Sequence, residues 1–74
     1  MKQMRHRFHF INTRSYEISP NRWVPKAEVF WNEGADTTFE ILETPKELFK
    51  DLEQADNHAI QIATAWVDER IANI

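Results

Sequence analysis

The sequence contains no cysteine and only one glycine. The lack of cysteine excludes disulfide bonds, thiolate zinc sites and a nucleophilic thiol, and one glycine cannot build a loop that cradles a phosphate. The apolar runs are far too short to span a membrane. The basic first ten residues are not followed by the apolar stretch of a secretory signal. We therefore expect a cytoplasmic protein that contacts no membrane.

The chain has only 74 residues, so the core that it can form is small. A domain of this size buries only about 60% of the surface of its unfolded chain. Domains this small are usually stabilised by a disulfide, a metal or a partner subunit, and the first is excluded. No repeat or linker divides the sequence, so residues 1–74 are expected to form a single domain. Residues 1–7 form either its first strand or a flexible basic arm.

The first half of the chain alternates apolar and polar residues in the manner of strands. Two turn signals separate these segments. Pro20–Asn21 presets one turn, because proline fixes φ and asparagine tolerates left-handed backbone. The other turn holds the only glycine, Gly34. The expected strands are residues 8–11, 16–18, 22–31 and 37–43.

The periodicity changes near Thr44 from two residues to about 3.6, which indicates a helix. Two starts fit the sequence: one near Pro45 with Thr44 as the cap, and one at Leu52 with Asp51 as the cap. The apolar stripe ends close to residues 71–72. The fold class is therefore α+β: an antiparallel sheet of three to four strands, with one C-terminal helix packed on one face in two layers.

Three runs of the sequence carry a resemblance: "YEIS", "RWVPKAEVFW" and "HAIQIATAWVDER". In this order they resemble small uncharacterised bacterial proteins in which three antiparallel strands precede one helix. That helix has spaced alanines and ends in Trp-(Ile/Val)-Asp. The resemblance covers roughly residues 15–71 and concerns packing residues. It implies the fold and no activity.

The expected helix presents small residues, Ala55, Ala59 and Ala63, to the sheet. Small residues let a helix approach closely, and native packing density then requires bulky side chains opposite. We therefore assign the aromatic residues of the strands to the core and not to a stacking platform. The predicted core partners of the helix are Tyr16, Trp23, Trp31, Phe39 and Ile41, together with Trp66 on the helix.

One helix can cover only one face of such a sheet, and the other face remains open to water. The pattern places Val24, Phe30 and Leu42 on that open face. Contiguous exposed apolar residues mark contact surfaces. These three residues are therefore the candidate interface with another protein, most simply a second copy of the chain. A free edge strand offers a second route to pairing.

The charges divide unevenly along the chain. Residues 1–26 carry six basic side chains and one carboxylate, whereas residues 27–74 carry three basic side chains and eleven carboxylates. This division fits either ion pairs between neighbouring elements or a basic arm that binds nucleic acid. The candidate nucleic-acid contacts are Arg5, Arg7, Phe8, Phe10 and Arg14. The net charge of −3 argues against that alternative. In a second alternative, the acidic half docks on a basic protein surface as an inhibitor or adaptor.

No set of residues has the arrangement of an active site. Asp68 and Glu69 lie near Trp66, but their positions favour solvated carboxylates. His6 and His9 are three residues apart and are expected to point to opposite faces of a strand, which does not suit a metal. We therefore predict no catalytic residue, no metal and no cofactor. The predicted function is that of a small non-enzymatic binding protein that forms a homodimer.

Overall fold

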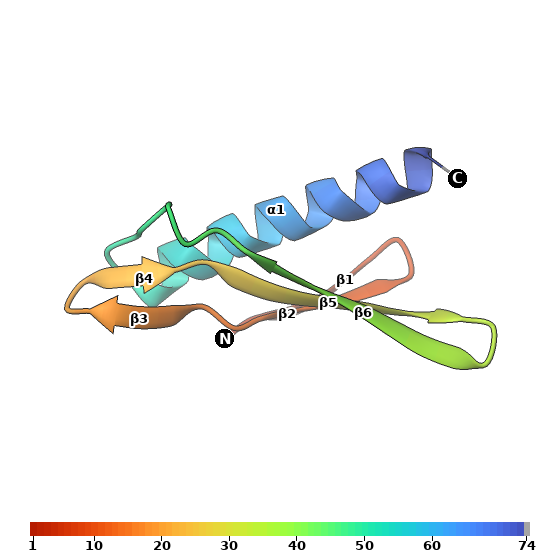
Figure 1. The fold of residues 1–74 in the computed structure, drawn as a ribbon, viewed down its shortest axis with the longest axis horizontal. Coiled ribbons are helices and arrows are strands. Elements are labelled where there is room, and N and C mark those ends of the chain that lie inside the picture. Colours follow the sequence, from red (N-terminus) through yellow and green to blue (C-terminus); the bar gives the residue numbers. More distant parts are fainter. Residues whose placement is uncertain (74) are drawn as a thin grey trace.

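Four strands form one antiparallel sheet in the order β1-β2-β5-β6, and two more form a separate hairpin, β3-β4. The computed structural model describes residues 1–73. A single helix, α1, follows the last strand (Figure 1). The elements are β1 (Gln3–His6), β2 (His9–Thr13), β3 (Tyr16–Ser19), β4 (Arg22–Val24), β5 (Lys26–Glu33), β6 (Asp36–Glu43) and α1 (Leu52–Ala72).

The N-terminal segment is a strand and not a flexible arm. His6 pairs with His9, and the two residues between them, Arg7 and Phe8, have φ values of 49° and 67°. Positive φ at both central residues matches the right-handed twist of a tight hairpin. The reversal also places both histidines on one side of the sheet, because directly paired residues share a face. Our expectation that they point to opposite faces is therefore wrong.

The other two turns lie where the sequence predicts them. Asn21 adopts a φ of 60° between β3 and β4, and Gly34 a φ of 62° between β5 and β6. Pro25 separates β4 from β5. Proline has no amide hydrogen to donate to a neighbouring strand, so the ladder is interrupted at this residue.

The helix begins at the second of the two predicted starts. Asp51 is the N-cap, and its side chain accepts a hydrogen bond of 2.8 Å from the amide of Gln54. This bond satisfies one of the free amides of the first turn. Before the helix, the backbone of Phe49 pairs with that of Trp23, with N–O distances of 2.8 and 3.0 Å. The start near Pro45 does not occur.

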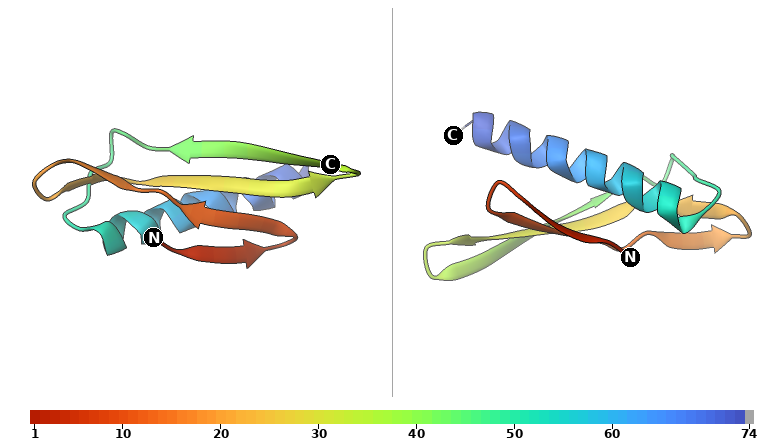
Figure 2. Two further views of the ribbon diagram at one scale, coloured as in Figure 1. Left: turned by 90° about the horizontal axis from the view of Figure 1, so that it is seen from below. Right: turned by 180° about the vertical axis from the view of Figure 1, so that it is seen from behind.

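Helix α1 crosses one face of the sheet, and within residues 1–73 no other element covers the opposite face (Figures 1 and 2). The alanine stripe is buried as predicted. Trp66 packs against the same core, and its ring centroid lies 5.6 Å from that of Trp31. These findings confirm the two-layer α+β fold. The buried residues of the core are Ile11, Ala27, Val29, Trp31, Ala59, Ala63 and Val67.

Four of the aromatic and apolar residues assigned to the core lie elsewhere. Trp23 is half-buried outside the core cluster. Tyr16, Phe39 and Ile41 are exposed, Phe39 to 66%. In β6 the register pairs Phe39 with Phe30, so both point away from the helix. The helix contacts this edge strand only sparsely, so polar residues occupy most of the helix-facing positions of β6.

Candidate functional site

Helix α1 leaves one face of the sheet uncovered; we call it the open face. Side chains alternate between the two faces of a strand. Ile11 and Val29 are fully buried under the helix, so Phe10 and Phe30, their neighbours in sequence, point to the open face. Figure 2 (left) looks onto this side of the sheet, with the helix behind it.

Three phenylalanines form a continuous row across the open face. Phe10 of β2 pairs with Phe30 of β5, which pairs with Phe39 of β6. The rings of Phe10 and Phe30 are stacked, with centroids 5.3 Å apart and an angle of 18° between their planes. Phe39 and Phe10 are exposed to 66% and 41%. We call Phe10, Phe30 and Phe39 the aromatic row.

A cation ends the row on the β1 side. Arg5 pairs directly with Phe10, and its guanidinium carbon lies 5.5 Å from the Phe10 ring centroid and 6.0 Å from that of Phe8. Both distances suit a cation–π contact. Within residues 1–73, Arg5 forms no ion pair.

Phe8 is the most exposed aromatic residue on this side, with 82% of its surface open to water. Arg7 and Phe8 both adopt left-handed backbone, which costs about 1–3 kcal/mol for residues of this kind. The turn is held from the helix side. The carbonyl of Arg7 accepts a hydrogen bond of 2.8 Å from His9 Nδ1, and Arg7 Nη1 donates to Asp68 at 3.1 Å.

The remaining charges near the row neutralise one another. Arg14 Nε lies 3.1 Å from Glu28, and Lys26 Nζ lies 3.8 Å from Glu43. The hydroxyl of Tyr16 donates a 2.9 Å hydrogen bond to Glu43, and this bond raises the pKa of Tyr16. Among the basic side chains placed on this face, Arg5 is the one without a carboxylate partner in the described chain.

Other basic residues of the N-terminal segment bind the helix. His6 Nε2 and Arg7 Nη1 lie 2.8 and 3.1 Å from Asp68, and these two contacts lower the pKa of the Asp68 carboxyl. Lys2 Nζ lies 3.6 Å from Glu53. Many basic residues of the N-terminal half therefore form ion pairs with carboxylates of the C-terminal half. This agrees with our interpretation of the uneven charge as ion pairs between neighbouring elements.

The predicted protein interface is only partly present on the open face. Phe30 lies there as predicted. Val24 is almost completely buried, with 1% exposure, and Leu42 packs against the core. For Leu42 the reason is the register of β6, because Leu42 pairs with Ala27, which points to the helix. Our placement of Val24 and Leu42 on an exposed surface is therefore wrong.

The predicted nucleic-acid contacts are brought together in part. Arg5, Phe8 and Phe10 converge at one end of the aromatic row. Arg7 turns to the helix and binds Asp68, and Arg14 is paired with Glu28. Arg5, Phe8 and Phe10 therefore lie together on the open face, whereas the two other candidates are bound to carboxylates.

Sequence reasoning missed Phe39 and Ile41 as members of the open face, although a signal exists. A two-residue turn at Gly34–Ala35 pairs residue 33 with residue 36, and hence Phe30 with Phe39. Directly paired residues share a face. Once Phe30 is placed on the open face, the turn therefore places Phe39 there too.

At the far end of the helix, an aromatic and ionic cluster fixes α1 to β5. The Arg70 guanidinium lies 4.3 Å from the Trp31 ring centroid and donates a 2.6 Å hydrogen bond to Glu33. Trp31 Nε1 also donates to Glu33, at 2.8 Å, and these two bonds lower the pKa of Glu33. Because each of these groups already has a partner, we assign the cluster to packing.

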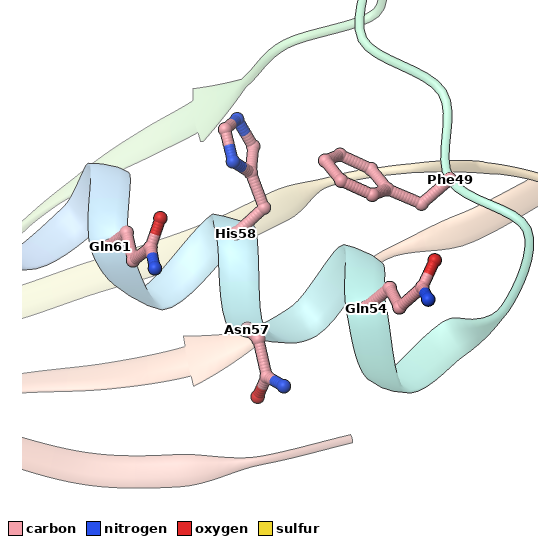
Figure 3. A pocket seen from close by; sticks show the side chains of 5 residues that line it. All are labelled: Phe49, Gln54, Asn57, His58 and Gln61. Atoms are coloured by element: carbon pink, nitrogen blue, oxygen red, sulfur yellow. The ribbon is translucent and has the colours of Figure 1, made fainter.

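A shallow depression of about 420 Å³ lies at the first turns of the helix (Figure 3). Phe49 and His58 form one wall, with ring centroids 4.9 Å apart, and His58 also contacts Glu47. Three amide side chains complete the lining: Gln54, Asn57 and Gln61. The amides are polar and uncharged, and Asn57 Oδ1 already accepts a hydrogen bond from Lys2.

Residues 1–73 contain no group of three or more histidine, cysteine, aspartate or glutamate side chains placed to hold a metal ion. In the same part of the chain, no helix combines the length and apolar character needed to cross a membrane. Comparison with models of known protein families, with curated proteins and with solved structures found no match.

Proposed function

We propose that this is a non-enzymatic cytoplasmic interaction protein that forms a homodimer through the open face. One observation carries the proposal: the aromatic row lies exposed on the one face of the sheet that the helix does not cover. Removing apolar surface from water contributes about 25 cal/mol per Å². Aromatic side chains are also the residues in which binding energy concentrates at protein interfaces.

Self-association fits the size of the protein. The core consists of aliphatic residues and Trp31 under a single helix, and small domains are often completed by a second subunit. Two antiparallel sheets pack face to face about 10 Å apart, with the side chains of their inner faces interdigitating. Two copies joined through the open face would form such a sandwich, with a helix on each outer side.

The charges on the face also favour a protein partner over nucleic acid. Arg14 and Lys26 are neutralised by Glu28 and Glu43, and within residues 1–73 Arg5 is the cation of this face that has no carboxylate partner. Binding to nucleic acid normally rests on several basic side chains that contact phosphates. In the part of the chain that the structure describes, this face has one unpaired cation and a row of aromatic rings, which suits an apolar contact better.

The sheet has two edge strands, β1 and β6, and pairing through β6 is disfavoured by its residues. Asp36, Glu40 and Glu43 lie along this edge strand. Charged side chains on an edge strand oppose pairing with a second edge. The open face is therefore a better site for self-association than the β6 edge.

The proposal is tested by the molar mass in solution of the wild type and of two variants with the same change in charge. Phe30→Glu places a carboxylate at the centre of the aromatic row. Gln61→Glu, on an exposed position of the helix, is the matched control. We expect dimers for the wild type and for Gln61→Glu. For Phe30→Glu we expect a folded monomer, with folding checked by circular dichroism.

Phe30→Ser serves as a milder variant in case Phe30→Glu does not fold, and we expect it to weaken the dimer. A wild-type monomer at every concentration tested would contradict the proposal, as would a Phe30 variant that remains a full dimer. Retention of the wild type on single-stranded DNA or RNA at low salt, lost in Arg5→Ala, would assign the face to nucleic acid instead.

A further inference from the structure

We infer that the two copies meet around a two-fold axis that runs nearly along the strands, so that β1 of each copy faces β6 of its partner. In this arrangement, Arg5 lies against the partner's Phe39. The inference rests on the proposed homodimer and specifies its geometry. The observation that carries it is the placement of Arg5 on β1 at one end of the aromatic row and of the exposed Phe39 ring on β6 at the other end.

Symmetry leaves two arrangements for a dimer of aligned sheets through this face. When two identical sheets face each other, the two-fold axis lies in the plane between them. Aligned sheets cross at about 30°, so the axis lies about 15° from the strands or about 15° from the perpendicular to them. The first arrangement places each strand over a different strand of the partner. The second places each strand over its own copy.

The two arrangements place different residues in contact, because the row lies directly across the strands. Arg5 and the three rings of the aromatic row pair in the order Arg5, Phe10, Phe30, Phe39. With the axis along the strands, the order is reversed in the partner. Arg5 then faces the partner's Phe39, and Phe10 faces the partner's Phe30. With the axis across the strands at the level of the row, Arg5 faces the partner's Arg5.

The charge of Arg5 decides between the two arrangements. Its guanidinium already lies above the Phe10 ring on the open side of the sheet. In the arrangement across the strands, two guanidinium groups would meet at an apolar interface with no carboxylate between them, which is unfavourable. In the arrangement along the strands, each guanidinium meets the ring of the partner's Phe39. Phe39 is 66% exposed in the single chain and free to accept a cation on its face.

The position of the row supports the same arrangement. Strands β2 and β5 form the centre of the four-stranded sheet, and the stacked pair of Phe10 and Phe30 lies on them. An axis that passes between these two strands covers both edges of the sheet equally. The stacked pair of phenylalanines then lies at the centre of the interface, and the cations lie at its rim.

A carboxylate introduced at residue 39 has opposite effects in the two arrangements. With the axis along the strands, Phe39→Glu places a carboxylate against Arg5 of the partner subunit, twice in each dimer. With the axis across the strands, it places two carboxylates against each other. Phe39→Gln removes the ring without adding charge and is the matched control.

The test is the dimer dissociation constant of each variant at low and at high salt. The inference predicts that Phe39→Glu dimerises about tenfold more tightly than Phe39→Gln at low salt, because two interfacial ion pairs form. The difference should shrink at high salt, as screening requires. It should also vanish when both variants carry Arg5→Gln.

The failure of this inference is distinct from that of the proposed function. Suppose that the wild type is a dimer that Phe30→Glu dissociates, but that Phe39→Glu dimerises no better than Phe39→Gln. The proposed homodimer is then supported, and the arrangement along the strands is wrong. If the wild type is a monomer, the homodimer and its proposed geometry are both wrong. A gain for Phe39→Glu that persists in the Arg5→Gln background would also overturn the inference, because the gain would not come from Arg5.

Discussion

The two faces of the sheet are built from the same strands but differ in what they bury. On the helix side, Ile11 and Val29 are fully buried; on the open side, their sequence neighbours Phe10 and Phe30 form an aromatic row. Even Thr13 is fully buried on the helix side, whereas Phe39 is 66% exposed on the other. The side of a residue therefore follows from register and from the reach of the helix, and not from hydrophobicity alone.

This difference suggests that the two faces have separate tasks. The helix side holds small and aliphatic residues that permit close packing of α1, and it stabilises the single chain. The open side holds large rings that contribute little to the core of one copy. We propose that this side contacts a second copy.

The largest expected difference between the faces is in stability. Ile11→Ala leaves a cavity in the core and should lower the free energy of unfolding by about 2–5 kcal/mol. Phe10→Ala removes one stacked ring from the surface and should lower it by about 1 kcal/mol. Both are measured by urea denaturation at protein concentrations low enough for the chain to be monomeric. Equal losses would show that the two faces do not differ as described.

A smaller effect on the free energy of unfolding is expected at the first turn of the helix. Asp51→Ala removes the side chain that caps the first turn and should lower the free energy of unfolding by about 1 kcal/mol. Asp51→Ser retains a capping oxygen and is the control, with little expected change. If both substitutions cost the same, the hydrogen bond to the amide of Gln54 does not contribute to stability.

A weaker effect, on stability at acidic pH, is expected from Asp68 on the helix side. His6 and Arg7 lower the pKa of Asp68 in the folded chain. Their contribution is complete above the pKa of an unfolded aspartate, about 3.9, and is lost as the pH falls through the lower folded value. Asp68→Asn should therefore remove a small part of the acid dependence of thermal stability. Identical pH profiles for this variant and the wild type would contradict the assignment.

The smallest expected effect, seen in alkali, concerns the open side. The hydrogen bond to Glu43 raises the pKa of Tyr16, so its contribution is complete below the pKa of an unfolded tyrosine, about 10. It is lost as the pH rises through the higher folded value. Titration of the tyrosine absorbance should give an elevated midpoint in the wild type. Glu43→Gln should bring that midpoint down.

The sequence was sufficient to predict the elements with strong local signals. The turns at Asn21 and Gly34 rest on residues with marked backbone preferences, and both occur. For the helix, the sequence left two starts open, and the one capped by Asp51 occurs. The hairpin between β1 and β2 could not be predicted in this way. Its turn residues, Arg7 and Phe8, are not turn formers, and their left-handed backbone is held by contacts with His9 and the helix.

The open face could be predicted only in part. Alternation placed Phe30 correctly, because β5 lies beneath the helix and its inner residues are apolar. In β6, the apolar residues Phe39 and Ile41 lie on the side opposite to the helix, so the hydrophobic pattern of this edge strand indicates the wrong face. Pro25 interrupts the alternation at Trp23 and Val24, and the burial of Val24 did not follow from the pattern.

The molar mass of the wild-type chain, measured by light scattering over a range of concentrations at low and moderate salt, tests most directly whether the open face joins two copies. We predict twice the chain mass of 8.8 kDa at both salt concentrations. A mass equal to that of one chain at every concentration would contradict the homodimer. It would show that the aromatic row remains exposed in the protein alone.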